Sequence, residues 1–456
     1  MTRTPLDPAV GISTVALPRG RLAAFAGGSI GMGVWITVPG LLLLYFLTDV
    51  LAVSPLVAGF ALLVPKIADV LLHPFVGHFS DAQRARHGHR LALMLVACLL
   101  PLVFAGMFAV PGALHGNGAA IWVAGFYVLG NLLYAAYQVP YLSTPADLAI
   151  DYHERTRLMS FRMVVLTVGI LLSGVLAPEI VGGDDPTRRG YLLMGVVLAA
   201  AMLGAMAVGI TGVRRLAAVA GTPANPAPPP LRGVRVLLTS LRDPHFRPLV
   251  IAFLLTSTAT HLVLAAVPYF TTYELGDSGL TSVLIAAFLA PALLATPAWL
   301  AVARRIGKQR GLLLAQAVFA GGCLVVALGH HAPLAVLVAV VAVLGIAFAA
   351  LQLLAFSMLP DVVAAAAGRK IADAGSYTGV WTAADSAGGA LGPYLYAACL
   401  AIGGFVGSGS GDDVAQTASA LDAVRYGFAI VPAVLLLAAF LIQRRYTLDR
   451  AATPAS

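Results

Sequence analysis

Long apolar runs separated by short polar breaks dominate this chain of 456 residues. A helix needs roughly 20 apolar residues to cross the hydrocarbon core of a bilayer, and most of the runs reach that length. The pattern therefore predicts an all-α membrane protein with twelve transmembrane helices. The predicted helices cover residues 23–48, 55–79, 91–112, 119–143, 157–181, 190–213, 247–273, 280–303, 311–329, 333–358, 375–405 and 420–443.

The composition supports the membrane interpretation. The chain is 59% hydrophobic and only 11% charged, with a mean hydropathy of +0.90, whereas soluble domains carry about 25% charged residues. The first twenty residues are too polar for a signal peptide. Cys98, Cys323 and Cys399 lie far apart within apolar runs and lack metal-ligand spacing, so we expect buried thiols and no metal site.

Basic residues orient the predicted helices. Most of the 28 lysines and arginines fall on alternate loops, together with both chain ends. By the positive-inside rule, both termini are then cytoplasmic and the protein is a multi-pass protein of the cell (inner) membrane. The net charge of +8 is spread over these loops and forms no single patch, so we expect no nucleic-acid partner.

The sequence also repeats. Residues 86–90 after the second helix resemble 305–310 after the eighth, and 143–147 resemble 357–361 at an offset of about 215–220 residues. A Pro-rich linker at 220–233 separates the repeats. Two six-helix halves of this kind predict the major facilitator fold, in which the halves rock about a central site. The expected parts are an N-terminal segment 1–22, a bundle 23–213, a linker 214–246, a bundle 247–443 and a tail 444–456.

Three ionisable residues interrupt the second predicted helix. Lys66, Asp69 and His73 share one helical face, and charges at membrane depth need a functional or structural reason. One interpretation is an ion pair that locks helices together. Because histidine titrates near neutral pH, the other interpretation, a cation or proton coupling site, is favoured.

Polar and aromatic residues also share faces on other predicted helices. On the fourth helix, Gln138 continues a stripe that indicates a cavity lining, although single residues of the stripe can also serve as bonds between helices. On the eleventh helix, Asp385 lacks a nearby basic partner, so it either stays protonated or pairs with Lys66 or His261. The predicted substrate-facing residues are Trp35, Tyr127, Asn131, Tyr134, Gln138, His261, Tyr377, Trp381, Thr382 and Asp385.

Charged residues at the cytoplasmic helix ends form the last predicted set. Asp81 and the arginines after it can form charge-assisted bonds that latch one conformation and break on rocking. Simple positive-inside orientation explains Arg84 and Arg86 equally well. The predicted gating residues are Asp81, Arg84, Arg86, Arg90, Asp147, Arg155 and Arg162.

Several blocks resemble one transporter family. LLLLYFLTDVLAVSPLVAGFALLVPKIADVLLHPFVGHFSDAQRARHGHR (41–90) and YQVPYLSTPADLAIDYHERTRLMSFR (137–162) are similar to the glycoside–pentoside–hexuronide:cation symporters, the melibiose-permease-like major facilitators. The segments AFSMLPDV and AGSYTGVWTAADSAGGALG carry the similarity through the second half. The resemblance implies import of a sugar or glycoside coupled to Na⁺, Li⁺ or H⁺, with a small molecule and the bilayer as partners, no cofactor, and a monomer.

The chain departs from that family at informative positions. Asp69 matches the first acid of the family's cation site, but His73 stands where the second acid is expected. Imidazole is a poor ligand for sodium, so we expect proton coupling, with Na⁺ as the alternative. The family's sugar-binding acid on the first helix falls near Gly33, and the lysine of its eleventh helix falls at Ser386.

These departures leave alternative functions open. A symporter for a sugar, glycoside or similar small solute is the main prediction. The same fold moving an amphipathic substrate, such as a lysolipid or hydrophobic metabolite, is the alternative. A sensor or scaffold that does not transport would lack a central cavity. We expect no enzyme, because the Gly-rich stretch 27–33 lies within a membrane span and the sequence shows no nucleophile–base pair.

Overall fold

The computed structural model describes residues 17–148, 152–182, 187–220, 239–328, 332–367, 374–409, 414–446 and 448. Within them the chain is helical, apart from connections and one isolated β-bridge. The N-terminal half comprises α1 (Arg19–Tyr45), η1 (Phe46–Val50), α2 (Pro55–His87), α3 (Leu91–Val96), η2 (Ala97–Leu99), α4 (Leu100–Phe108), α5 (Asn117–Asp147), α6 (Tyr152–Val181) and α7 (Arg188–Ala220). The C-terminal half comprises η3 (Thr239–Arg242), α9 (Phe246–Tyr269), η4 (Phe270–Glu274), α10 (Leu280–Ile306), α11 (Lys308–Leu328), α12 (Leu334–Ala367), α13 (Ala374–Ile402) and α14 (Ala418–Gln443).

The predicted helix pattern is confirmed. Eleven of the described helical stretches are long and apolar enough to cross a membrane. The twelfth, α13, has 29 residues but is rich in glycine and alanine and carries Asp385. The predicted third helix is broken by the short turn η2, and Pro101 starts the helix that follows. The Pro-rich part of the predicted linker lies outside the described residues.

Several helices continue past their apolar runs. Helix α2 reaches His87, eight residues beyond its predicted end, and stops at Gly88 with φ of +73°. Glycine takes this left-handed conformation without strain and caps helix ends. Arg84, Arg86 and His87 occupy the last turn, where positive charge favours the negative end of the helix dipole. The polar residues after position 79 therefore end the apolar stretch that was predicted to span the membrane, but the helix itself continues beyond it.

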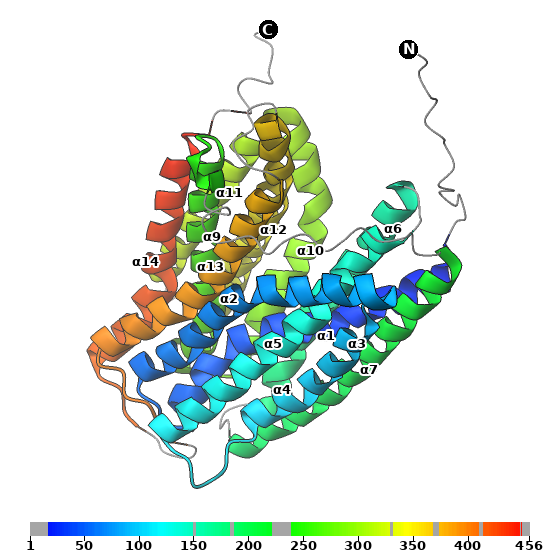
Figure 1. The fold of residues 1–456 in the computed structure, drawn as a ribbon. Helices are drawn as coiled ribbons and strands as arrows, with labels where there is room; N and C mark the ends of the chain where they lie inside the picture. Colours follow the sequence, from blue (N-terminus) through cyan, green and yellow to red (C-terminus); the bar gives the residue numbers. More distant parts are fainter. Residues whose placement is uncertain are drawn as a thin grey trace, which may run out of the picture.

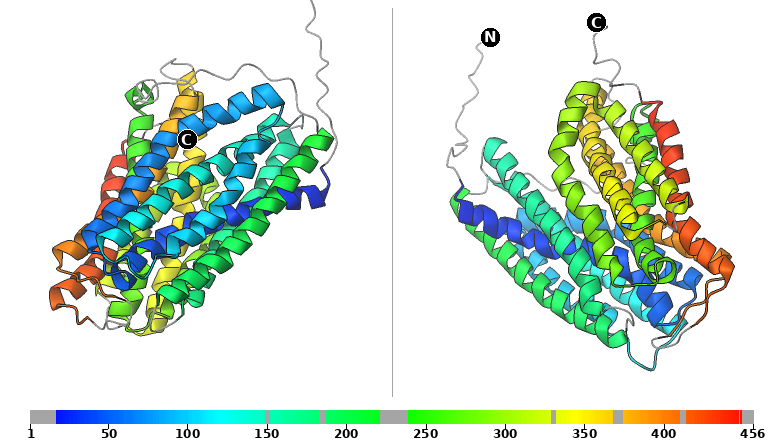
Figure 2. Two further views of the ribbon diagram at one scale, coloured as in Figure 1. Left: turned by 60° about the horizontal axis from the view of Figure 1, so that its bottom comes forward. Right: turned by 180° about the vertical axis from the view of Figure 1, so that it is seen from behind.

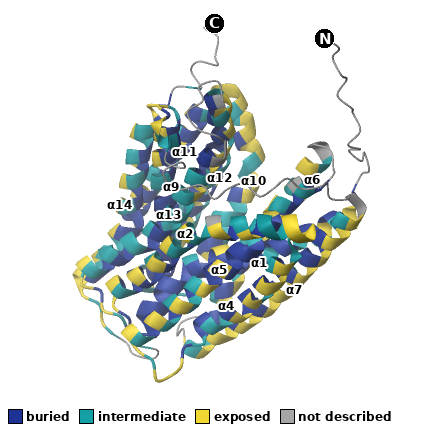
Figure 3. Cartoon of the chain, viewed as in Figure 1, coloured by how far each residue is buried: buried dark blue, intermediate teal, exposed yellow. Residues whose placement is uncertain are grey.

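Three helix pairs make the largest contacts between the halves. Helix α2 packs on α13, α6 on α10, and α1 on α9. We call the end at which α1 begins and α14 finishes the terminal end, and the opposite end the far end. In Figures 1 and 2 the halves meet at the far end, and α6 and α10 diverge toward the terminal end. Large apolar side chains stay exposed on the outer surface, for example Leu102, Ile121 and Leu328, as Figure 3 shows by the exposed residues along the outer helix faces. A bilayer would cover this surface.

Candidate functional site

A chain of hydrogen-bonding groups links α2 to α5. Asp69 lies in α2 with 7% of its side chain exposed, and its Oδ1 is 3.0 Å from His73 Nδ1, one helical turn further on. The other ring nitrogen, Nε2, is 3.4 Å from Oε1 of Gln138 in α5. His73 itself is about one quarter exposed. The predicted coupling residue Asp69 and the predicted substrate residue Gln138 are thus joined through one imidazole.

Lys66 lies one turn before Asp69 on the same helix. Its ammonium group is 5.6 Å from the centre of the Tyr127 ring, a cation–π arrangement. It interacts electrostatically with Asp69 and, across the two halves, with Asp385. No described carboxylate forms a direct salt bridge with it.

A cluster of buried aromatic rings lies between α1 and α5. Trp35 of α1 lies with its ring centre 6.2 Å from that of Tyr134, nearly parallel, and 5.8 Å from Tyr127. A Cβ at Gly130 would come within 2.1 Å of the Trp35 ring, so only glycine allows this approach. The Trp35 indole nitrogen and the Tyr134 hydroxyl are buried and have no partner among the described residues.

Asn131 differs from its neighbours in the predicted stripe. Its side chain is 1% exposed, and its amide donates to the backbone carbonyl of Pro65 in α2 at 3.3 Å. This bond ties α5 to α2 where proline interrupts the regular helix pattern. The structure thus places Asn131 between two packed helices, with its Oδ1 buried and without a partner among the described residues.

The C-terminal half carries a second polar cluster on α9 and α13. Ser257 donates to Asp385 Oδ1 at 3.0 Å, and its hydroxyl lies 3.4 Å from His261 Nδ1. The same imidazole nitrogen lies 2.8 Å from the Ser257 carbonyl. A Cβ at Gly388 would fall 2.4 Å from the Ser257 hydroxyl, so the glycine lets α13 approach α9. Asp385 and His261 therefore meet through a serine that the sequence analysis did not single out as a site residue.

Three predicted residues of α13 have different surroundings. Trp381 stacks on Phe253 at 3.9 Å between ring centres and is buried. Tyr377 is buried and donates to Asp243 at 2.9 Å. This contact corrects the prediction for Tyr377, which is held in packing near the terminal end. Thr382 is exposed and bonds the carbonyl of Thr378.

Four of the seven predicted gating residues, Asp81, Arg84, Arg90 and Asp147, form a network within one half. Arg84 pairs with Asp147 of α5, and Arg90 pairs with Asp147 at 2.8 Å and with Asp81 at 2.6 Å. Burial disfavours the charged form of Arg90, but the hydrogen bonds and negative charges of Asp147 and Asp81 outweigh it, so its pKa lies above the ordinary value. Arg86 and Arg155 are exposed. The network joins α2 and α5 and does not bridge the two halves.

Arg162 is the clearest correction to the gating set. It lies in α6 with 6% exposure, and its guanidinium is 6.0 Å from the Tyr141 ring centre. Its other polar contacts are to methionine sulfurs, at 3.3 Å to Met163 and 4.0 Å to Met32. No described carboxylate pairs with it. An unpaired buried charge is costly, and the surroundings of this arginine differ from those expected at a helix end.

Residues that sequence reasoning missed tie the halves together at the far end. Tyr45 donates to Thr272 at 3.2 Å, and the hydroxyls of Thr48 and Tyr269 are 2.7 Å apart. Tyr273 donates to Asp49. A sequence signal existed, because YFLTDV at 45–50 and YFTTYE at 269–274 are a further repeat, at an offset close to that of the loop motifs.

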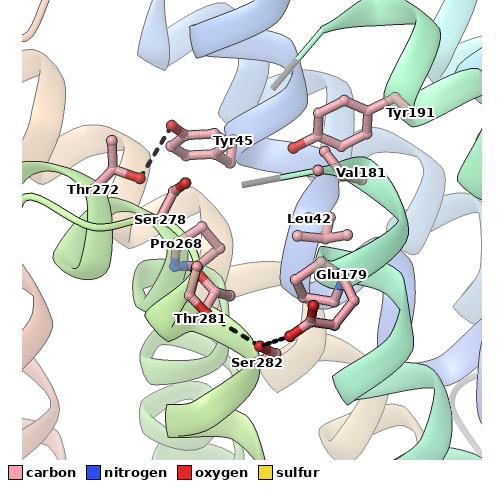
Figure 4. A pocket seen from close by; sticks show the side chains of 13 residues that line it. Leu42, Tyr45, Glu179, Val181, Tyr191, Pro268, Thr272, Ser278, Thr281 and Ser282 are labelled. Carbon is pink, nitrogen blue, oxygen red and sulfur yellow. Dashed lines mark hydrogen bonds between the residues drawn. The ribbon is translucent and has the colours of Figure 1, made fainter. Parts of the chain in front are cut away.

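A small pocket lies beside these contacts. Its volume is about 70 Å³, enough for a few water molecules and too small for a sugar. Figure 4 shows that Glu179 and Ser282 close one side of it, and Tyr45 and Thr272 the other. The pocket is therefore part of the closed far end and does not fit a substrate-sized ligand.

The fold and the paired halves define a transporter of the major facilitator class. Similar solved structures include a bacterial homologue of the lysosomal transporter Spinster in an inward-facing conformation (TM-score 0.69, 14% identity, 96% of this chain and 100% of that one). The D-xylose–proton symporter gives a TM-score of 0.66 at 15% identity, covering 92% and 96%. At these identities the likeness concerns the fold alone.

The sequence comparison identifies the family. The family model described as MFS/sugar transport protein matches residues 24–450, so the chain belongs to that family. The expected resemblance is thereby confirmed.

Curated relatives include transporters named for different substrates. The mouse sodium-dependent lysophosphatidylcholine symporter 1 is 25% identical over 71% of this chain and 66% of its own length. The Escherichia coli putative glycoside/cation symporter YagG is 33% identical over 34% and 36%. The uncharacterized symporter sll1374 of Synechocystis is 30% identical over 40% and 35%. The matched segments span from about one third to two thirds of these relatives.

Proposed function

We propose that the chain is a secondary active transporter that imports a sugar, glycoside or similar small polar solute together with protons, by alternating access. The observation that carries this proposal is the series of hydrogen bonds that runs from Asp69 through His73 to Gln138. It joins an acid, a group that titrates near neutral pH, and an amide that can bond substrate hydroxyls. Proton binding and solute binding thereby share one hydrogen-bonded unit.

The chemistry of the imidazole explains how the two events are linked. Asp69 Oδ1 and Gln138 Oε1 are both acceptors, so both ring nitrogens of His73 must donate, which requires the protonated ring. A neutral ring bonded to Asp69 through Nδ1–H leaves Nε2 as an acceptor. Gln138 must then turn its NH₂ group toward Nε2. The charge on His73 thus decides whether Gln138 offers the solute a donor or an acceptor.

The coupling ion is proposed to be H⁺. The second ligand position of the family's cation site holds His73 here, and sodium prefers hard oxygen ligands. Lys66 stands one turn away on the same helix face, and its positive charge further disfavours a bound metal cation. Na⁺ is the competing ion, because a curated relative is named a sodium-dependent lysophosphatidylcholine symporter.

The orientation follows from the distribution of basic residues. We place the terminal end in the cytoplasm of a cell membrane, as the positive-inside rule requires. The structure, joined at the far end, then represents an inward-facing state. Residues 23–213 and 247–443 act as the two rocking units, with 214–246 as their cytoplasmic connection. The solute and the surrounding lipid are the partners we assign, and the protein works as a monomer.

The test uses purified protein in proteoliposomes. A thermal-shift screen of glycosides and lysolipids first supplies a substrate. Its addition to vesicles containing a trapped pH dye should acidify the lumen, and uptake should follow an imposed pH gradient. Uptake that an imposed Na⁺ gradient drives equally well at constant pH would contradict proton coupling, since the Asp69–His73 unit has no role for sodium.

One observation favours a second substrate class. Arg162 is buried and pairs with no carboxylate among the described residues, and its guanidinium faces aromatic and thioether groups. A phosphate or carboxylate on an amphipathic molecule would neutralise that charge and place an apolar chain among such groups. This supports the alternative of a lysolipid or a similar amphipathic anion.

The two substrate classes respond differently to loss of the charge. Arg162→Gln should abolish binding of an anionic lysolipid but leave a neutral glycoside within a few-fold. Arg162→Lys serves as the matched control, because it keeps the charge and loses the planar fork. Equal loss of both substrates in Arg162→Gln, at unchanged melting temperature, would exclude a headgroup-specific role.

A further inference from the structure

The contacts at the far end are arranged with the symmetry of the two halves. Tyr45 and Tyr269 occupy equivalent positions of the repeat, as do Thr48 and Thr272. Tyr45 bonds Thr272 at 3.2 Å, and Tyr269 bonds Thr48 at 2.7 Å. Each half therefore offers one tyrosine and one threonine, and each tyrosine bonds the threonine of the other half.

The sequence separations express the same symmetry. The bonded pairs are 227 and 221 residues apart, and Asp49 and Tyr273, which bond each other directly, are 224 residues apart. The third pair thus lies on the axis that relates the other two. The rings of Tyr45 and Tyr269 meet edge to face at 5.1 Å between centres, a favourable aromatic geometry.

Local backbone geometry positions these groups. Helix α1 continues into the π-helical turn η1, and α9 continues into the π-helical turn η4 at the equivalent place. Such turns are rare and concentrate at functional sites. A π turn rotates the residues that follow it relative to a regular helix. The widened turns hold Thr48 and Asp49, and Thr272 and Tyr273, respectively.

The direction of the hydrogen bonds can be assigned. Asp49 is buried, and as a carboxylate it only accepts. Thr48 donates to Asp49, so its single hydrogen is used and it must accept from Tyr269. Two tyrosines of the C-terminal half therefore deliver their hydrogens toward Asp49, one directly and one through Thr48. Ser408 adds a bond from its hydroxyl to the Asp49 carbonyl at 3.3 Å.

We propose that Tyr45, Thr48 and Asp49 with Tyr269, Thr272 and Tyr273 form a reciprocal clasp that positions the halves in the closed-far-end state and sets its population. For the substrate to enter from the far end, all three pairs must separate together, because they lie on one short segment of each half. The clasp thus acts on the rocking step, whichever solute or ion is carried.

The experiment measures conformation without a substrate. Spin labels at Ala113→Cys and Val406→Cys, with the three native cysteines changed to alanine, report the separation of the halves at the far end. Both positions are exposed. The full chain is studied in lipid nanodiscs by pulsed electron paramagnetic resonance. Wild-type background should give a dominant short-distance population.

Single variants should shift that population toward longer distances. Tyr45→Phe, Thr272→Val and Tyr269→Phe should each reduce the ratio of closed to open by about fivefold, the usual effect of one net hydrogen bond. Thr48→Val should reduce it more, because the Thr48 hydroxyl bonds both Tyr269 and Asp49. Asp49→Ala should shift it further, because two donors lose their acceptor. Tyr191→Phe is the control, since Tyr191 is a buried residue beside the small pocket whose hydroxyl is bonded to none of the described residues.

Double variants give the decisive result. Tyr45→Phe with Thr272→Val should equal either single variant, and Tyr269→Phe with Thr48→Val should equal Thr48→Val alone. Tyr45→Phe with Thr48→Val should instead show the product of both effects. Additive effects within the bonded pairs would overturn the reciprocal arrangement. Distances that stay at wild type in all single variants would overturn the clasp itself. Melting temperatures monitor folding in both cases.

Discussion

The two halves share one framework but place their ionisable groups differently. In the N-terminal half, Asp69 contacts His73 directly, and the imidazole reaches Gln138 on another helix. In the C-terminal half, Asp385 and His261 lie on different helices, and Ser257 stands between them. The spacing of four residues along one helix recurs in both, as Asp69 with His73 and Ser257 with His261.

We infer from this difference that the two clusters have different roles in transport. The N-terminal cluster can accept a proton at an imidazole and pass the change in hydrogen-bond direction to the neighbouring helix. The C-terminal cluster connects α9 and α13 through a hydroxyl, which can donate to an ionised carboxylate and can also accept from a protonated carboxyl group. We therefore expect substitutions in the N-terminal cluster to affect coupling, and those in the C-terminal cluster to affect substrate affinity.

The largest effect is expected at Asp69. Asp69→Asn should abolish uphill accumulation while leaving expression and downhill exchange intact, because the amide cannot hold a proton-dependent charge beside His73. Accumulation against a gradient in proteoliposomes is the measurement. Asp385→Asn is the matched control and should retain accumulation with altered affinity. Equal loss of accumulation in Asp69→Asn and Asp385→Asn would contradict the proposed functional difference between the two halves.

The ionic networks at the terminal end provide the next comparison. Asp147 holds Arg84 and Arg90, all mostly buried. Asp147→Asn should lower the free energy of unfolding by about 2–3 kcal/mol, since it weakens charge-assisted bonds to two arginines. The melting temperature in detergent checks this. A melting temperature identical to that of the wild type would show that the network acts only during transport.

A moderate effect is expected at Gln138. Gln138→Ala should weaken substrate binding by about fivefold, the loss of one net hydrogen bond, with the pH dependence of transport flattened. Equilibrium binding at two pH values measures both quantities. Gln138→Glu is a useful companion because it fixes an acceptor at this position. If the alanine variant binds substrate normally at both pH values, Gln138 only supports His73.

The smallest effect concerns the equivalent network of the C-terminal half. Lys308 pairs with Asp361 at 2.5 Å, but both side chains are at least one third exposed. Asp361→Asn should change the free energy of unfolding by about 0–1 kcal/mol, as is usual for exposed pairs. Thermal melts of Asp361→Asn and Asp147→Asn in the same detergent compare the halves directly. A larger loss for Asp361→Asn would reverse the ranking.

Much of the site was predictable because helix spacing fixes which side chains share a face. Lys66, Asp69 and His73 lie on one side of α2 as their positions require, and α5 brings Gln138 to them. Spacing along one helix carries no information about the neighbouring helix. The sequence therefore did not show that Asn131 bonds to Pro65, or that Tyr377 packs against the segment before α9.

Arg162 shows that a positive charge in the sequence does not by itself locate a residue at a cytoplasmic helix end. Its position in a basic loop block suggested a helix end, but α6 begins ten residues earlier, so the side chain enters the membrane region between α1 and α5. Only the helix start decides how deep a residue lies. The far-end clasp was missed for another reason, because tyrosine and threonine near a helix end are common and acquire meaning only when paired.

The sequence by itself determined the class of the molecule. Hydrophobic run length, alternation of basic loops and the internal repeat specify twelve helices in two related halves, because the cost of polar groups in hydrocarbon leaves few other arrangements. The tertiary structure alone decided which side chains contact each other. It placed the His73 imidazole against the Gln138 amide and buried Arg162 away from every described carboxylate. It also brought each of the equivalent tyrosines Tyr45 and Tyr269 to the threonine of the opposite half. Such contacts depend on helix packing and on the relative position of the halves, which lie more than two hundred residues apart in the chain.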